Sequence, residues 1–87
     1  MSQVHRELVK NGALLLDVRT PEEFREQHIP GATNIPVDQL PARLGELGPT
    51  SRKIVVHCRS GARSARAAGV LRQAGYDVHD FGGIGSW

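Results

Sequence analysis

Two short apolar runs, Ala13 to Val18 and Lys53 to His57, constrain the fold of this chain more than any other feature of its sequence. The first run is almost wholly apolar, which is typical of a strand buried on both faces of a sheet. The second is rich in β-branched residues and is the clearest strand in the sequence. Because helical patterns alternate with such strands, the sequence predicts a parallel sheet covered on both faces, in an α/β domain of three layers.

The other elements are predicted from their boundary residues. Thr20, Pro21 and Glu23 are typical of a helix start, in which Thr20 caps the helix, Pro21 takes the first position and Glu23 closes a capping box. Glycine follows the apolar pattern where helices are expected to end. On these signals we expect helices at 2–11, at 21 to before 29, at 38–47 and at 64–74, and further strands at 34–37 and 77–81.

The length of 87 residues allows one small domain, 1–87, with one core. The apolar share of 39% and charged share of 23% are typical of a soluble globular protein. No apolar stretch is long enough to cross a membrane, and the residues after Met1 lack the layout of a secretory signal. We therefore expect a cytoplasmic protein, or a periplasmic one if a signal peptide has been removed, with no membrane partner. The net charge of +2 gives no indication of nucleic-acid binding.

Cys58 is the single cysteine of the chain, so it cannot form an internal disulfide or, by itself, a thiolate metal site. A lone cysteine in a soluble protein is more often a core residue than a nucleophile. Here, however, Cys58 follows a strand directly and precedes a glycine-containing loop and a helix. Since ligands of parallel sheets bind where strands end and helices begin, this position favours the nucleophile.

The loop from Cys58 to Ser64 has the composition of an anion site. Its backbone N–H groups and the start of the next helix offer partial positive charge, and Gly61 permits tight curvature. Arg59 and Arg63 would each be a solvated charge elsewhere, but beside Cys58 we interpret them as anion-binding. Between Leu47 and Tyr76 there is no Asp or Glu, while six cations occur: Arg52, Lys53, Arg59, Arg63, Arg66 and Arg72. This field favours the thiolate, the reactive form of cysteine, so we expect an anionic sulfur exposed at neutral pH.

Residues outside the loop are predicted to support it. Asp17 ends a buried strand and is expected to anchor backbone N–H groups or to pair with an arginine rather than to take part in chemistry. Arg19 and Glu23 are expected to fix the turn after that strand. His57 should point to the opposite face of its strand from Cys58, which predicts a packing role and not that of a base.

The glycines at 82 and 83 indicate a close approach of two backbones, which we expect to occur against the active loop. Trp87 is expected to pack over that junction.

Four segments, in this order and at these intervals, resemble the rhodanese family, in particular its single-domain thiosulfate sulfurtransferases. They are Leu16 to Phe24, His28 to Pro36, the Cys58 loop, and Gly82 to Trp87. The resemblance implies a three-layer α/β/α domain with a central, mostly parallel five-stranded sheet. It also implies a six-residue active loop without a metal or organic cofactor. In that loop Cys58 is catalytic, and the substrate-binding residues are Arg59, Ser60, Gly61, Ala62 and Arg63, with Asp17 and Ser64 as loop support.

The activity implied by the resemblance is sulfur transfer. In family members the cysteine attacks the outer sulfur of thiosulfate, sulfite leaves, and a persulfide remains until cyanide or a thiol removes the sulfur. The implied partners are thus a small anionic donor, a small acceptor and a sulfur-relay protein. An alternative is a persulfide carrier that acts with a partner protein such as a cysteine desulfurase.

Two further alternatives are weaker. Phosphatases with a cysteine nucleophile have one residue more between cysteine and arginine than the four that separate Cys58 from Arg63, and the narrower ring suits a persulfide. A regulatory relative without activity is disfavoured because such domains often lack the cysteine.

Overall fold

The computed structural model describes residues 3–87. Its strands are β1 (Leu14–Asp17), β2 (Thr33–Asn34), β3 (Ile54–Cys58) and β4 (Val78–Gly83). Its helices are α1 (Gln3–Lys10), α2 (Pro21–Glu26) and α3 (Ala62–Gln73), with two 3₁₀ helices, η1 (Val37–Leu47) and η2 (Ile84–Ser86). Within these residues no helix combines the length and the apolar character that a membrane span needs.

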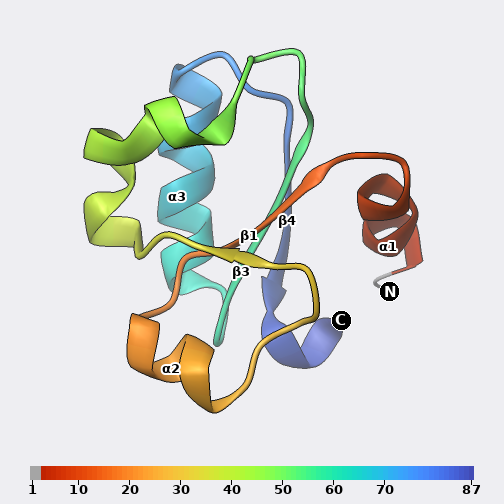
Figure 1. Ribbon diagram of the computed structural model, residues 1–87, viewed down its shortest axis with the longest axis vertical. Coiled ribbons are helices and arrows are strands. Elements are labelled where there is room, and N and C mark those ends of the chain that lie inside the picture. The colour runs from red at the N-terminus through yellow and green to blue at the C-terminus, as the bar shows by residue number, and fades with distance from the viewer. Residues whose placement is uncertain (1–2) are drawn as a thin grey trace.

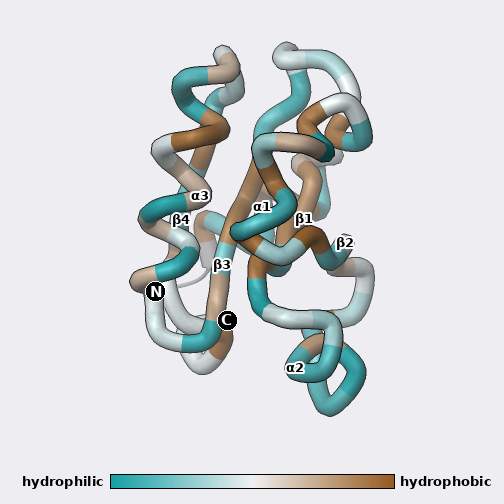
Figure 2. The backbone as a smooth tube through the Cα atoms, turned by 90° about the vertical axis from the view of Figure 1, so that its left-hand side faces the viewer, coloured by the Kyte–Doolittle hydropathy of each residue, from teal (hydrophilic) through white to brown (hydrophobic). Residues whose placement is uncertain are grey.

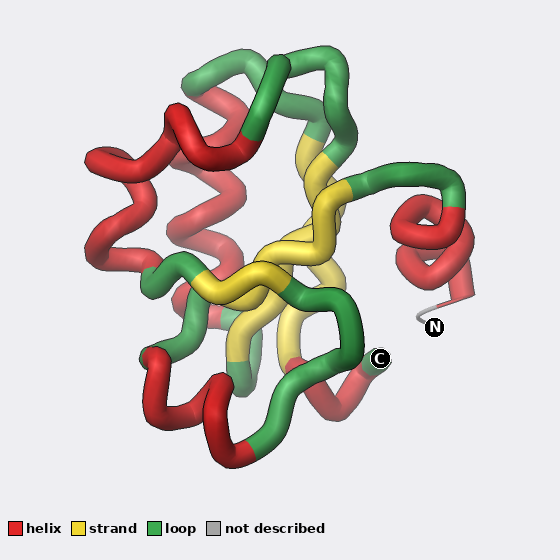
Figure 3. The backbone as a smooth tube through the Cα atoms, in the orientation of Figure 1, coloured by secondary structure: helices red, strands yellow, loops and turns green. Residues whose placement is uncertain are grey.

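The strands form one parallel sheet in the order β2-β1-β3-β4. The inner strands β1 and β3 pair from Leu14 opposite Ile54 to Asp17 opposite His57. Because both have a neighbour on each side, their backbone polar groups are satisfied within the sheet, as burial requires. Figure 1 and Figure 3 show the strands in the middle, with α3 and η1 on one side and α1 on the other. The predicted three-layer α/β/α architecture is therefore confirmed.

The expected number of five strands is wrong for the described part of the chain. Within residues 3–87 the sheet has four strands. The segment before β1 is helical, and the segments between the four strands form helices and tight connections. In the described part of the chain, no fifth strand therefore pairs with either edge of the sheet.

Two hydrophobic clusters fill the two faces of the sheet. The larger includes Leu16 and Val56 and packs beneath α3 and η1. The smaller includes Leu15 and Val55 and packs beneath α1. Neighbouring residues of a strand point to opposite faces, so two adjacent apolar side chains serve two different cores. Brown, apolar backbone along β1 and β3 in Figure 2 follows this burial on both faces.

The start of α2 follows the predicted capping box. The Glu23 backbone N–H donates to Thr20 Oγ1 over 3.2 Å, and the Thr20 N–H donates to Glu23 Oε1 over 2.9 Å. Pro21 occupies the first turn, where its missing N–H is not needed. This local prediction is confirmed.

The segment predicted as an α-helix at 38–47 is instead the 3₁₀ helix η1, with a break in helical geometry at Arg43. An α-helix that begins at Val37 would need an N–H at position 41 to bond the Val37 carbonyl, and Pro41 has none. The segment still buries Leu40 and Leu47 against the larger cluster. Elsewhere the boundaries shift by a few residues, since β2 is shorter than predicted and β4 continues to Gly83.

Candidate active site

The loop that carries Cys58 connects the end of β3 to the start of α3. Gly61 caps α3 with a φ of 109°, a left-handed conformation that residues with a side chain rarely adopt. A Cβ atom on Gly61 would also lie 3.7 Å from the Gly82 Cα atom of β4. The glycine predicted to permit a tight turn thus adopts a backbone conformation that favours glycine.

The Cys58 sulfur lies inside a ring of polar groups. The Gly61 backbone N–H donates to Cys58 Sγ over 2.9 Å. The Ser64 hydroxyl oxygen lies 3.6 Å from the same sulfur and 3.1 Å from the Gly61 carbonyl oxygen. The side chain that supports the loop therefore contacts both the nucleophile and the backbone that surrounds it.

These contacts lower the pKa of the Cys58 thiol below its ordinary value. Burial acts in the opposite direction, because it disfavours the charged thiolate. Hydrogen bonds from the backbone and hydroxyl of Ser64 and from the N–H groups of Gly61 and Ser60 outweigh burial. The predicted stabilisation of the thiolate is therefore supported by the geometry.

The expectation of an exposed sulfur is wrong for this conformation, because Cys58 is 0% exposed and belongs to the larger hydrophobic cluster. The loop closes over the sulfur, and Gly61 makes the contact that closes it. Sequence alone indicated the charge around the sulfur but not how tightly the backbone folds over it. A reagent therefore reaches Cys58 only when the groups that cover the sulfur move apart.

The end of β4 packs against the backbone of the active loop. The pairing of β3 with β4 shifts register after Val56, which places Gly82 opposite His57 and Gly83 opposite Cys58. A Cβ atom on Gly83 would lie only 2.6 Å from the Arg59 carbonyl oxygen. The predicted close approach of this glycine pair to the active loop is confirmed.

The two arginines of the loop differ in their surroundings. Arg63 donates to both carboxylate oxygens of Glu23, over 2.7 and 3.0 Å. Arg59 is exposed and has no ion-pair partner within residues 3–87. Arg59 thus carries an uncompensated positive charge, whereas that of Arg63 is balanced.

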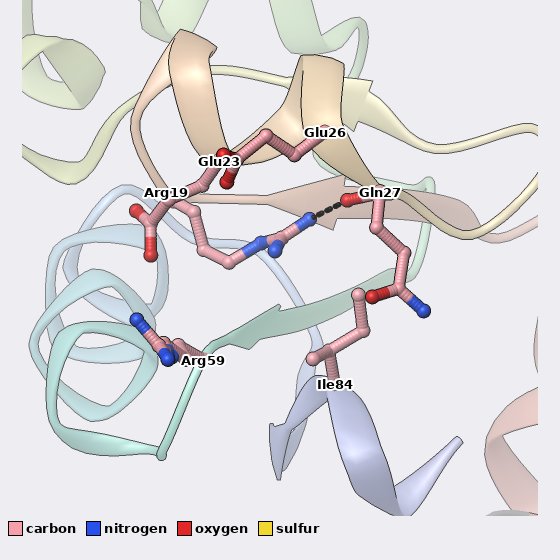
Figure 4. Close-up of a pocket in the computed structure, with 6 residues that line it drawn as sticks. All are labelled: Arg19, Glu23, Glu26, Gln27, Arg59 and Ile84. Carbon is pink, nitrogen blue, oxygen red and sulfur yellow. Dashed lines mark hydrogen bonds between the residues drawn. The ribbon is translucent and has the colours of Figure 1, made fainter.

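A cleft of about 190 Å³ lies beside the loop. Figure 4 shows Arg59 on one side of it, α2 with Glu23 and Glu26 on another, and Ile84 below. The lining residues are Arg19, Glu23, Glu26, Gln27, Arg59 and Ile84. Cys58 is not among them, so the cleft leads to the edge of the loop and stops short of the sulfur.

Asp17 and Arg19 form a buried pair at the end of β1. Asp17 accepts hydrogen bonds from the Arg19 backbone N–H over 2.9 Å and from its side-chain Nη2 over 2.7 Å. The same Nη2 donates to the Gln27 carbonyl oxygen over 2.6 Å, drawn dashed in Figure 4. The interpretation of Asp17 as a partner for an arginine is confirmed, and Arg19 ties the turn after β1 to the end of α2.

His57 packs on the opposite face of the sheet from the Cys58 side chain, as predicted. Its ring stacks on Phe81 of the smaller cluster with a centroid separation of 4.9 Å. Burial lowers the pKa of His57, which favours the neutral ring. Trp87 also contacts Phe81, at 5.1 Å, so the structure places it on the α1 side of the sheet.

Other side chains add no metal centre to this site, since no group of three or more metal-ligating side chains converges within residues 3–87. The contact that sequence reasoning missed is that between Glu23 and Arg63, which are 40 positions apart. The capping box explains Glu23 from local sequence alone, and no local signal indicated a second partner.

Comparisons with known proteins agree with this geometry. The model of the rhodanese-like domain matches residues 1–87. A sulfurtransferase of Allochromatium vinosum is 43% identical over 85% of this chain and 70% of its own length. The thiosulfate sulfurtransferase PspE of Escherichia coli is 35% identical over 79% of this chain and 68% of its own length.

A solved structure has the same fold. The human single-domain sulfurtransferase TSTD1 superposes with a TM-score of 0.84 at 26% identity, covering 100% of this chain and 90% of its own. The similarity therefore extends over the whole sheet and the loop that carries the cysteine.

Proposed function

The chain belongs to the rhodanese-like family, and on this basis we propose that it moves a sulfane sulfur from thiosulfate, or a similar donor, to cyanide or a thiol through a persulfide on Cys58. The observation that carries the proposal is the ring of donors around Cys58 Sγ, headed by the Gly61 N–H at 2.9 Å. Such a ring stabilises negative charge on sulfur before and after transfer.

The proposed reaction has two displacement steps. The Cys58 thiolate attacks the outer sulfur of thiosulfate, the sulfur–sulfur bond of the donor breaks, and sulfite leaves with the electron pair. The negative outer sulfur of the persulfide is then held by the N–H groups of Ser60 and Gly61 and by the Ser64 hydroxyl. An acceptor thiolate or cyanide attacks this outer sulfur, and the Cys58 thiolate is released unchanged.

Arg59 is the residue that we assign to recognition of the anionic donor. Its guanidinium is exposed on the cleft and is not neutralised by a carboxylate within residues 3–87. The backbone N–H groups of residues 60–62 complete the substrate-binding set, and Arg63 contributes from the first turn of α3. Asp17 and Ser64 remain the proposed loop support, and no cofactor enters the reaction.

Phosphoryl chemistry is disfavoured by the size of the loop. The Gly61 N–H already lies 2.9 Å from the sulfur, so the ring must open by one atom to hold the outer sulfur of a persulfide. A tetrahedral phosphoryl group needs room for three further oxygens. We therefore expect no hydrolysis of an aryl phosphate.

The test uses the sulfur atom itself. Wild-type protein incubated with thiosulfate should gain the mass of one sulfur atom, lose it on addition of cyanide, and turn over thiosulfate and cyanide repeatedly. Cys58→Ser should show none of these three results, whereas Glu22→Gln, on an exposed face of α2, should behave as wild type. Turnover that persists in Cys58→Ser would refute the proposal.

The burial of Cys58 favours a second candidate, a persulfide carrier served by a partner protein. A sulfur that is 0% exposed is a poor target for a small donor until the loop opens, and a docked protein can stabilise the open form. We place either reaction in the cytoplasm, where a lone thiol stays reduced. Slow loading from thiosulfate together with fast loading from a cysteine desulfurase would identify the carrier.

A further inference from the structure

Glu23 connects two parts of the molecule that the sequence keeps apart. Through its backbone and Oε1 it closes the capping box of α2 with Thr20. Through both carboxylate oxygens it accepts hydrogen bonds from Arg63 at the first turn of α3. The Glu23 side chain is 20% exposed and that of Arg63 33% exposed, so the pair is partly shielded from water.

In this ion pair, the negative charge of Glu23 neutralises the positive charge of Arg63. The hydrogen bond from Arg63, followed by those from Thr20, lowers the pKa of Glu23 to about 2, so Glu23 is ionised at neutral pH. The pKa of Arg63 is raised, first by Glu23 and to a smaller degree by the charges of Cys58 and Asp17. Arg63 therefore lies within the electrostatic reach of both the carboxylate and the sulfur.

We propose that Glu23 is a positioning residue of the sulfur-transfer site, which fixes the Arg63 guanidinium beside the active loop and cancels its charge there. An anion that enters the loop then encounters one uncompensated cation, Arg59, in place of two. Donor binding is weaker for that reason, but sulfite is released more readily. The inference rests on the proposed function only in taking the donor to be an anion.

The other charges around the loop do not replace this role. Asp17 is engaged by Arg19 through both of its carboxylate oxygens. Asp80 of β4 accepts a hydrogen bond from the Gly82 N–H over 2.8 Å. Glu26 lines the cleft from α2 but has no bond to Arg63. Glu23 is thus the carboxylate that neutralises a loop arginine within residues 3–87.

The variant Glu23→Gln removes the negative charge of Glu23 but keeps a side-chain oxygen that accepts hydrogen bonds. Glutamine serves as well as glutamate at the third position of a capping box, and its amide oxygen still accepts from Arg63. Loss of the negative charge should lower the pH midpoint for alkylation of Cys58 by iodoacetamide by roughly half a unit to one unit. The KM for thiosulfate should fall about three- to tenfold, while kcat stays the same or decreases, because ground state and product are both held more tightly.

Glu22→Gln is the matched control. It removes the same charge one residue away, from a side chain that is 75% exposed and whose ion pair with Arg25 spans 3.8 Å. This control should leave both the alkylation midpoint and KM unchanged. A second variant, Glu23→Asp, keeps the charge with a shorter reach and should retain the wild-type midpoint.

The outcomes separate the two proposals. An unchanged or raised midpoint in Glu23→Gln, or a raised KM, would assign Glu23 a purely structural role and overturn the inference. The alkylation profile needs no turnover, so it decides the role of Glu23 even if wild-type protein fails to use thiosulfate. Such a failure would count against the proposed function alone.

Discussion

Replacement of Gly83 by alanine tests the geometry behind the active loop. The added Cβ would lie 2.6 Å from the Arg59 carbonyl oxygen, 3.4 Å from the Arg59 carbonyl carbon and 3.5 Å from the Ser60 Cα. Ordinary contact begins near 3.4 Å, so β4 and the loop must separate by 3.4 − 2.6 = 0.8 Å. The obstructing atoms belong to the backbone and cannot turn away as a flexible side chain would.

The size of the effect follows from this displacement. Overpacking of this kind costs about 1–3 kcal/mol of the free energy of unfolding. A shift of about 1 Å in a catalytic group costs about 100-fold in rate, so kcat/KM for sulfur transfer should fall by roughly ten- to 100-fold. Thermal unfolding and a thiosulfate:cyanide assay measure the two quantities on the same sample.

Gly85→Ala is the control for this experiment, because a Cβ at Gly85 would have no atom within 4 Å and its φ is not positive. The Gly85→Ala variant should have the melting temperature and the kcat/KM of the wild-type protein. If Gly83→Ala were equally neutral in both measurements, the loop would not be in contact with β4, and the account of how Cys58 is held would be wrong.

Three further predictions concern Ser64, Gly69 and Glu23. Ser64→Ala removes a hydroxyl that stabilises the thiolate, so the alkylation midpoint of Cys58 should rise and thiosulfate loading at neutral pH should slow. Gly69→Ala, in an exposed part of α3 with no atom within 4 Å of the new Cβ, should stabilise the protein by about 0.5–1 kcal/mol in a thermal melt. Glu23 has a folded pKa of about 2 against an ordinary 4.5, so its contribution is complete above pH 4.5 and is lost as pH falls toward 2. The difference in melting temperature between wild type and Glu23→Gln should therefore shrink over that interval.

Sequence alone predicted the features that depend on near neighbours. The capping box of Thr20 and Glu23 is a pattern within four residues, and the structure forms it as expected. The strand at 54–58 needed only its β-branched, apolar composition. The position of Gly83 against the loop was predicted because two successive glycines directly after a predicted strand indicate a close approach of two backbones.

Features that depend on distant partners were outside the reach of the sequence. The pair of Glu23 with Arg63 requires α2 and α3 to meet, and that meeting is decided by the order of strands in the sheet. Burial of Cys58 depends on how closely the loop backbone approaches the sulfur, with the Gly61 nitrogen 2.9 Å from Sγ. Composition indicated the charge of the loop, but only the packing of the loop backbone determines whether the Cys58 sulfur is exposed or covered.

The closed loop and the lowered pKa of Cys58 are two consequences of one set of contacts. While the sulfur is protonated, its S–H can donate to Ser64 Oγ, and the Ser64 hydroxyl then donates to the Gly61 carbonyl oxygen 3.1 Å away. Once the sulfur is ionised, it can only accept, and the Ser64 hydroxyl then donates to the sulfur as the Gly61 N–H does. The Gly61 carbonyl oxygen still accepts from the Ala65 N–H over 3.0 Å, so the first turn of α3 stays in place when the hydroxyl turns. The hydrogen bonds that lower the pKa of Cys58 are therefore also the ones that hold the loop closed over the sulfur. A persulfide, whose outer sulfur needs additional room under the same N–H groups, should favour an opened loop.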